Sequence, residues 1–112
     1  MSTGPSGVPP IADWNRLLDG RVAVVTGGGD GIGAAIASLF AAHGAHVEVA
    51  EVDPGRAARI QREVTDAGGA IRSHVAADHD VARLADAVLT EHRRIDVLVN
   101  NVGDYRPLVA FD

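Results

Sequence analysis

Short runs of apolar residues alternate along the chain with longer segments in which apolar positions recur at a helical period. The apolar runs are nearly continuous and rich in β-branched residues, as in strands that are buried on both faces of a parallel sheet. They predict strands at residues 21–26, 46–51, 70–77 and 95–100, and the segments between them predict helices at residues 34–43, 54–67 and 81–93. Strands and helices are therefore expected in strict alternation, beginning and ending with a strand.

The predicted helices begin and end at residues that suit those positions. Gly44 follows the first helix as a left-handed cap, and Gly68-Gly69 stops the second. Asp53 can cap the second helix, whose first residue, Pro54, needs no N–H donor. These local signals support the boundaries given by the apolar pattern.

Alternation of this kind predicts an α/β fold with right-handed crossovers and a doubly wound parallel sheet. We expect a βαβαβαβ unit of a Rossmann fold, with strand order 3-2-1-4. Ligands of such sheets bind outside the carboxyl ends of the strands. Clusters of glycine and polar residues follow the predicted strands, at residues 26–33, 51–53, 78–80 and 100–104. The sequence therefore predicts a ligand site at this edge of the sheet.

The densest cluster is TGGGDGIG, residues 26–33, which we call the glycine turn. A helix N-terminus attracts a phosphate if the backbone can come close, and glycine permits that approach. A side chain at Gly27, Gly31 or Gly33 would obstruct, respectively, the exit from the strand, the path of a pyrophosphate and the packing of helix on strand. The alternative is a turn that only connects a strand to a helix. A strand before it, a helix after it and an acid at the next strand end favour a dinucleotide, and a P-loop is excluded because the chain has no lysine.

The acid at the end of the second strand is Glu51. A carboxylate there can accept hydrogen bonds from the adenosine ribose and repels a 2′-phosphate, so NAD is the expected cofactor and NADP is disfavoured. Asp30, inside the glycine turn, adds repulsion of the same sign. For Asp53 we prefer the interpretation as a helix N-cap.

Composition narrows the classes of function. The chain has 112 residues, a formal net charge of −5 and a pI of about 5.4, which fit one domain and give no positive field for nucleic acid or an anionic membrane. It has no cysteine and no signal-peptide pattern, so the cytoplasm is the expected location, and its histidines lack a chelating spacing, so no metal is expected. Residues 1–16 are predicted to be a flexible lead-in, with Trp14 as an apolar anchor, before an incomplete domain at 17–112.

The chain resembles the short-chain dehydrogenase/reductase family, classical type. The glycine turn matches that family's Thr-Gly-x-x-x-Gly-x-Gly pattern, and residues 100–103, Asn-Asn-Val-Gly, match its Asn-Asn-Ala-Gly motif except for the valine. The resemblance implies an NAD site formed by the two motifs, the acid after the second strand and the residues after the third. These residues are Thr26, Gly27, Gly29, Asp30, Gly31, Ile32, Gly33, Glu51, Asp78, His79, Asn100, Val102 and Gly103.

The resemblance also implies how these residues would act. The glycine turn would line the pyrophosphate, and Ile32 would pack close to the cofactor. Asp78 would bind the adenine amino group. Asn100 would brace the sheet, while the backbone near Val102 and Gly103 would approach the adenine-side ribose.

The family's catalytic serine and Tyr-x-x-x-Lys belong to its second half, and this chain holds one tyrosine, Tyr105, and no lysine. No catalytic residue is therefore expected here. The resemblance implies the cofactor-binding half of an oxidoreductase that transfers hydride between NAD and a small alcohol or carbonyl substrate. The alternative is a truncated, non-catalytic protein that binds nucleotide or a partner. The fourth strand would form an edge that invites association, and the resemblance suggests a homo-oligomer.

Overall fold

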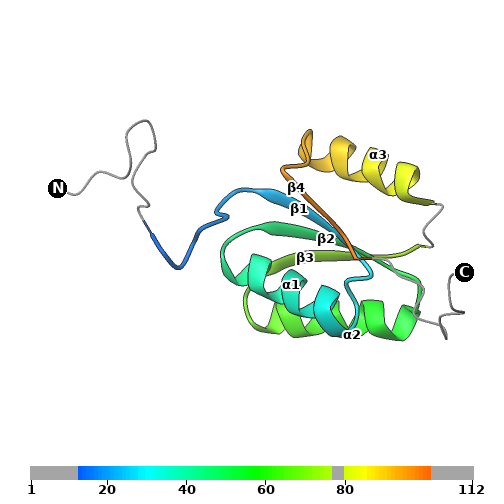
Figure 1. Cartoon of the computed structure of the whole chain (residues 1–112), viewed down its shortest axis with the longest axis horizontal. Coiled ribbons are helices and arrows are strands. Elements are labelled where there is room, and N and C mark those ends of the chain that lie inside the picture. The colour runs from blue at the N-terminus through cyan, green and yellow to red at the C-terminus, as the bar shows by residue number, and fades with distance from the viewer. Residues whose placement is uncertain (1–12, 77–79, 102–112) are drawn as a thin grey trace, which may run out of the picture.

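The computed structural model describes residues 13–76 and 80–101, which form a parallel sheet with helices on both faces (Figure 1). The strands are β1 (Val22–Thr26), β2 (His46–Glu51), β3 (Ala70–Val75) and β4 (Val97–Asn100). The helices are α1 (Gly31–Ala42), α2 (Pro54–Asp66) and α3 (Val81–His92). Helices α1 and α2 cover one face of the sheet, and α3 covers the other.

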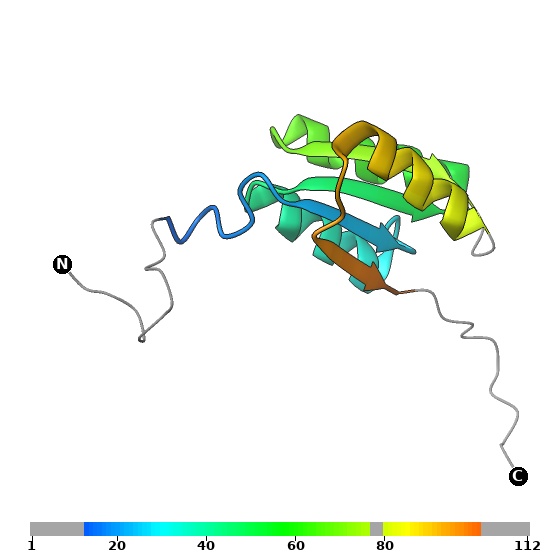
Figure 2. The ribbon, with the colours of Figure 1, turned by 90° about the horizontal axis from the view of Figure 1, so that it is seen from above.

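The strand order is β3-β2-β1-β4, and every neighbouring pair is parallel, as Figure 2 shows from above. This confirms the predicted fold class and strand order. The register pairs Thr26 with both Ala50 and Asn100. The carboxyl ends of the three strands β1, β2 and β4 therefore meet at one edge of the sheet, which is where the sequence places its glycine and polar clusters.

The two central strands are buried on both faces: β1 is buried at each of its positions, and β2 at each position after His46. Because side chains alternate along a strand, Val25 packs with Val47 and Ile60 on the α1 and α2 side, whereas Val24 packs with Val88 on the α3 side. Burial of an aliphatic side chain of this size stabilises a fold by about 1.5–3 kcal/mol. The two layers of core thus hold the strand that carries the glycine turn from both sides.

The predicted helix ends are largely confirmed. Gly44 and Gly68 adopt left-handed backbones, with φ of 90° and 87°. The Asp53 carboxylate accepts hydrogen bonds from Gly55 N at 2.8 Å and Arg56 N at 3.2 Å, so it is the N-cap that the sequence indicated.

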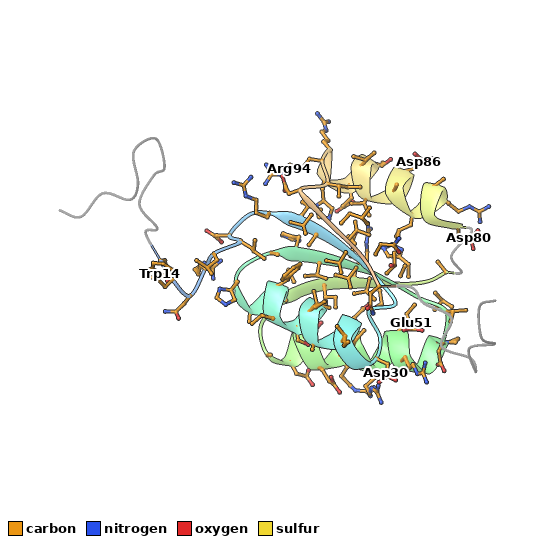
Figure 3. The ribbon with its side chains drawn as sticks, viewed as in Figure 1. Trp14, Asp30, Glu51, Asp80, Asp86 and Arg94 are labelled. Atoms are coloured by element: carbon orange, nitrogen blue, oxygen red, sulfur yellow. The ribbon has the colours of Figure 1, made fainter. Side chains whose placement is uncertain are left out.

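Three boundaries differ from expectation by more than one residue, and one side chain differs in burial. Helix α1 begins at Gly31, three residues before the predicted start, because an extended backbone at Asp30 (φ −153°, ψ 160°) lets the helix start inside the glycine turn. Strand β3 ends at Val75, two residues early, and β4 starts at Val97, two residues late. Trp14 is 70% exposed, so its prediction as an anchor is wrong (Figure 3). Among the described residues, the first backbone hydrogen bond from this region to the end of α1 comes after the lead-in, from Leu18 N to His43 O at 3.0 Å.

Candidate functional site

The carboxyl edge of the sheet brings together three of the predicted groups: the glycine turn, Glu51 at the end of β2, and Asn100 at the end of β4. Asp30 and Glu51 lie at the same end of the molecule, near the start of α2 (Figure 3). The predicted residues Asp78, His79, Val102 and Gly103 lie outside the described residues.

The backbone of the glycine turn requires glycine at three positions, for different reasons. Gly27 leaves β1 with φ 63° and donates to Ala50 O at 2.8 Å. A Cβ at Gly33 would lie 2.1 Å from Gly27 O, a contact that no side chain can make. Gly31 has φ 55°, yet among the residues that the structure describes a Cβ there would meet no atom within 4 Å. The turn is therefore tightly packed on its inner side and open at Gly31, beside the exposed Ile32.

Asp30 occupies the N-cap position of α1, but its side chain forms no capping hydrogen bond. The carboxylate faces α2 instead, with Oδ1 3.3 Å from Arg59 Nη2 and Oδ2 3.7 Å from Arg56 Nε. Arg59 also donates to Gly29 O at 3.3 Å. Sequence reasoning missed both arginines, although their spacing of three residues on one helix indicates a shared side.

Glu51 is 5% exposed, and both of its carboxylate oxygens accept backbone hydrogen bonds. Oε1 accepts from Gly29 N at 3.0 Å, and Oε2 accepts from Asp53 N at 3.1 Å. A Cβ at Gly29 would lie 2.6 Å from Glu51 Oε1, so Gly29 is required for contact with this acid. Glu51 therefore ties the glycine turn to the end of β2.

Thr26 and the two asparagines join the ends of β1 and β4. The buried Thr26 hydroxyl lies 3.3 Å from Val99 O and 3.2 Å from Asn100 Oδ1, and it accepts from Asn101 N at 2.9 Å. The Asn101 amide also reaches Gly27 O at 3.4 Å. The Thr26 and Asn100 side chains therefore link the ends of β1 and β4. Asn101 was given no role from the sequence, although its place in the second motif marked it.

A separate charge cluster lies between the sheet and α3. Glu48 is 1% exposed and accepts from Arg72 Nε at 2.8 Å, while Nε2 of His74 and of His92 lie 3.6 Å from its oxygens. The hydrogen bond to Glu48 raises the pKa of Arg72 above its ordinary value. The cluster joins β2, β3 and α3, and the described residues hold no group of three or more acids or histidines that could bind a metal.

Comparison with known proteins shows which family and which relatives the chain is similar to. The profile of a family described as short chain dehydrogenase matches residues 21–110. The chain is 42% identical over 101 residues to the sex determination protein tasselseed-2 of Zea mays, covering 89% of this chain and 30% of that protein. It is 36% identical over 96 residues to 7α-hydroxysteroid dehydrogenase of Escherichia coli K12, covering 83% and 38%. The chain thus spans well under half the length of these relatives.

The similar solved structures have this fold, but they are complexes with different cofactors, NADH in one and NADP in another. A 7α-hydroxysteroid dehydrogenase in complex with NADH superposes with a TM-score of 0.76 at 34% identity, over 83% of this chain and 38% of that one. A metagenomic short-chain oxidoreductase in complex with NADP superposes with a TM-score of 0.73 at 43% identity, over 78% and 41%. Among the helices that the structure describes, none has the length and apolar character needed to cross a membrane.

Proposed function

The chain belongs to the short-chain dehydrogenase family, and from this premise we propose that it is the NAD-binding half of an oxidoreductase acting on a small alcohol or carbonyl compound. The cofactor, when bound, would supply the hydride chemistry, with NAD⁺ as the acceptor and NADH as the donor. The chain's own residues would hold the pyrophosphate and the adenosine. No catalytic residue is proposed on this chain, because the one tyrosine has no lysine four residues on.

The observation that carries this proposal is the open backbone at Gly31, where α1 begins. The N-terminus of a 12-residue helix carries about half a positive charge, which favours a phosphate. The Asp30 side chain does not cap this helix, and within residues 13–76 and 80–101 no atom occupies the space that a Cβ at Gly31 would take. A pyrophosphate can therefore approach the helix at the point where the glycine turn is not packed against the protein.

The preference for NAD rests on Glu51. A carboxylate can accept about four hydrogen bonds, and two backbone N–H groups use part of that capacity. The remaining lone pairs would accept from the adenosine ribose hydroxyls, and the charge would oppose a 2′-phosphate. Asp78 with His79, and Val102 with Gly103, stay predictions for the adenine and ribose contacts.

We also propose a cellular location and an oligomeric state for the protein. A chain without cysteine suits a reducing compartment, so we infer a cytoplasmic protein. Strand β4 ends the sheet in the described part of the chain, with Leu98 61% exposed, which supports association into a homo-oligomer.

Isothermal titration calorimetry of the purified chain with NAD and with NADP tests the proposal. We expect NAD to bind more tightly. Glu51→Gln should narrow that preference by about tenfold, because it removes the charge but keeps an oxygen for Gly29 N–H. Glu63→Gln, an exposed change of the same charge on α2, is the matched control.

Two results would contradict parts of this proposal. If neither cofactor binds to a chain that circular dichroism shows to be folded, the site does not work as proposed and the non-catalytic alternative is favoured. If the two affinities keep their ratio in Glu51→Gln, Glu51 is not the residue that reads the ribose.

A further inference from the structure

The two arginines on α2 form the positive part of the glycine turn's surroundings. The guanidinium groups of Arg56 and Arg59 both lie against the Asp30 carboxylate, at 3.7 and 3.3 Å. All three side chains are about half exposed, with exposed fractions of 50%, 49% and 55%. Ion pairs exposed to this degree are weak, so both arginines could exchange Asp30 for a more highly charged anion.

These arginines also lie beside the acid that would read the ribose. A Cβ at Gly29 would be 2.6 Å from Glu51 Oε1 and 2.9 Å from Arg56 Cβ, so Glu51 and Arg56 flank the same backbone position. Arg59 donates to the carbonyl of that residue at 3.3 Å. A phosphate on a ribose hydroxyl bound by Glu51 would therefore lie on the side of the glycine turn that both guanidinium groups contact.

From this geometry we infer that Arg56 and Arg59 form a latent site for a 2′-phosphate, which Asp30 closes by pairing with both. The inference rests on the proposed function. Asp30 would then determine cofactor specificity in two ways: by its own negative charge and by its ion pairs with Arg56 and Arg59. Arginine is suited to this role because its planar fork binds phosphate oxygens in pairs.

The fold tolerates the substitution that opens this site. Asp30 makes no capping hydrogen bond, and asparagine is as good an N-cap residue as aspartate, so Asp30→Asn should fold normally. The variant releases both arginines and removes one negative charge. Asp86→Asn, at an exposed position on α3, removes the same charge on the opposite face of the sheet (Figure 3) and is the matched control.

The test is calorimetric titration of the chain with NAD, NADP, 5′-AMP and adenosine 2′,5′-bisphosphate, with circular dichroism to verify folding. In Asp30→Asn the affinity for adenosine 2′,5′-bisphosphate relative to 5′-AMP should rise by about tenfold or more, as expected for hydrogen bonds to a charged group. The NADP to NAD ratio should rise in parallel. Adding Arg56→Gln and Arg59→Gln to Asp30→Asn should abolish the gain.

The outcomes separate the inference from the proposed function. If the relative affinity for adenosine 2′,5′-bisphosphate rises equally in Asp86→Asn, the effect comes from net charge and the inference is overturned. If the rise persists after both arginines are replaced, the effect comes only from removing the repulsion by Asp30, which also overturns the inference. No gain for adenosine 2′,5′-bisphosphate overturns it whether or not NAD binds. A gain without NAD binding would uphold the phosphate site and refute the NAD-binding function.

Discussion

Gly31→Ala separates the folding role of the glycine turn from its proposed role in binding. Gly31 has φ 55°, and a Cβ there meets no atom of the described part of the chain within 4 Å. The cost to folding is therefore the left-handed backbone alone, about 1–2 kcal/mol, offset in part by about 0.4–1 kcal/mol of lost entropy in the unfolded chain. A net loss of about 1 kcal/mol should lower the Tm by about 4–8 °C in a domain of this size.

Gly20→Ala is the matched control for that substitution. Gly20 has φ 73°, a Cβ there also meets nothing within 4 Å, and it precedes β1 at the opposite edge of the sheet. The two variants should lose similar stability in thermal unfolding followed by circular dichroism. Only Gly31→Ala should lose NAD affinity, by about tenfold or more, because its methyl group takes the space through which the pyrophosphate would approach.

The reasoning fails if the two variants bind NAD equally well, because the open face at Gly31 would then not receive the pyrophosphate. It also fails if Gly31→Ala is much less stable than Gly20→Ala, because the space beside Gly31 would then be filled by the protein itself. Titration calorimetry and the difference in Tm between the two variants decide both points.

Three further predictions follow from other contacts. Gly33→Ala should destabilise the chain by about 1–3 kcal/mol or more in urea unfolding, because its Cβ would lie 2.1 Å from the Gly27 carbonyl oxygen. The pKa of Asp96 is lowered from 3.8, mainly by the hydrogen bond from Val22 N. The Asp96 carboxylate therefore stabilises the fold at pH values above 3.8, and this contribution is lost as the pH falls through the lowered pKa. Asp96→Asn should therefore lower the free energy of unfolding at about pH 7, and the difference from the wild type should shrink in urea unfolding at about pH 3. Leu98→Lys should shift sedimentation towards the monomer if the exposed β4 edge mediates association, and an unchanged profile would exclude that strand.

The sequence by itself determined the fold class, the order of elements and the helix ends other than the start of α1. Apolar periodicity distinguishes buried strands from helices, and Gly44, Asp53 and Gly68 act within a few residues of their own positions. Such local signals are readable in one dimension. The glycine turn belongs with them, since its requirement for glycine at Gly31 is a property of the local backbone.

Only the tertiary structure decided which charged side chains pair with one another. Asp30 and Arg59 are 29 residues apart, and Glu48 and Arg72 are 24 apart. Their pairing depends on strand register and on how α2 packs against the sheet. The sequence could therefore mark Asp30 as a charge near a phosphate but could not show that two arginines neutralise it. The prediction that Trp14 is an anchor was wrong for the same physical reason, because burial of a side chain depends on whether distant residues provide a surface to cover it.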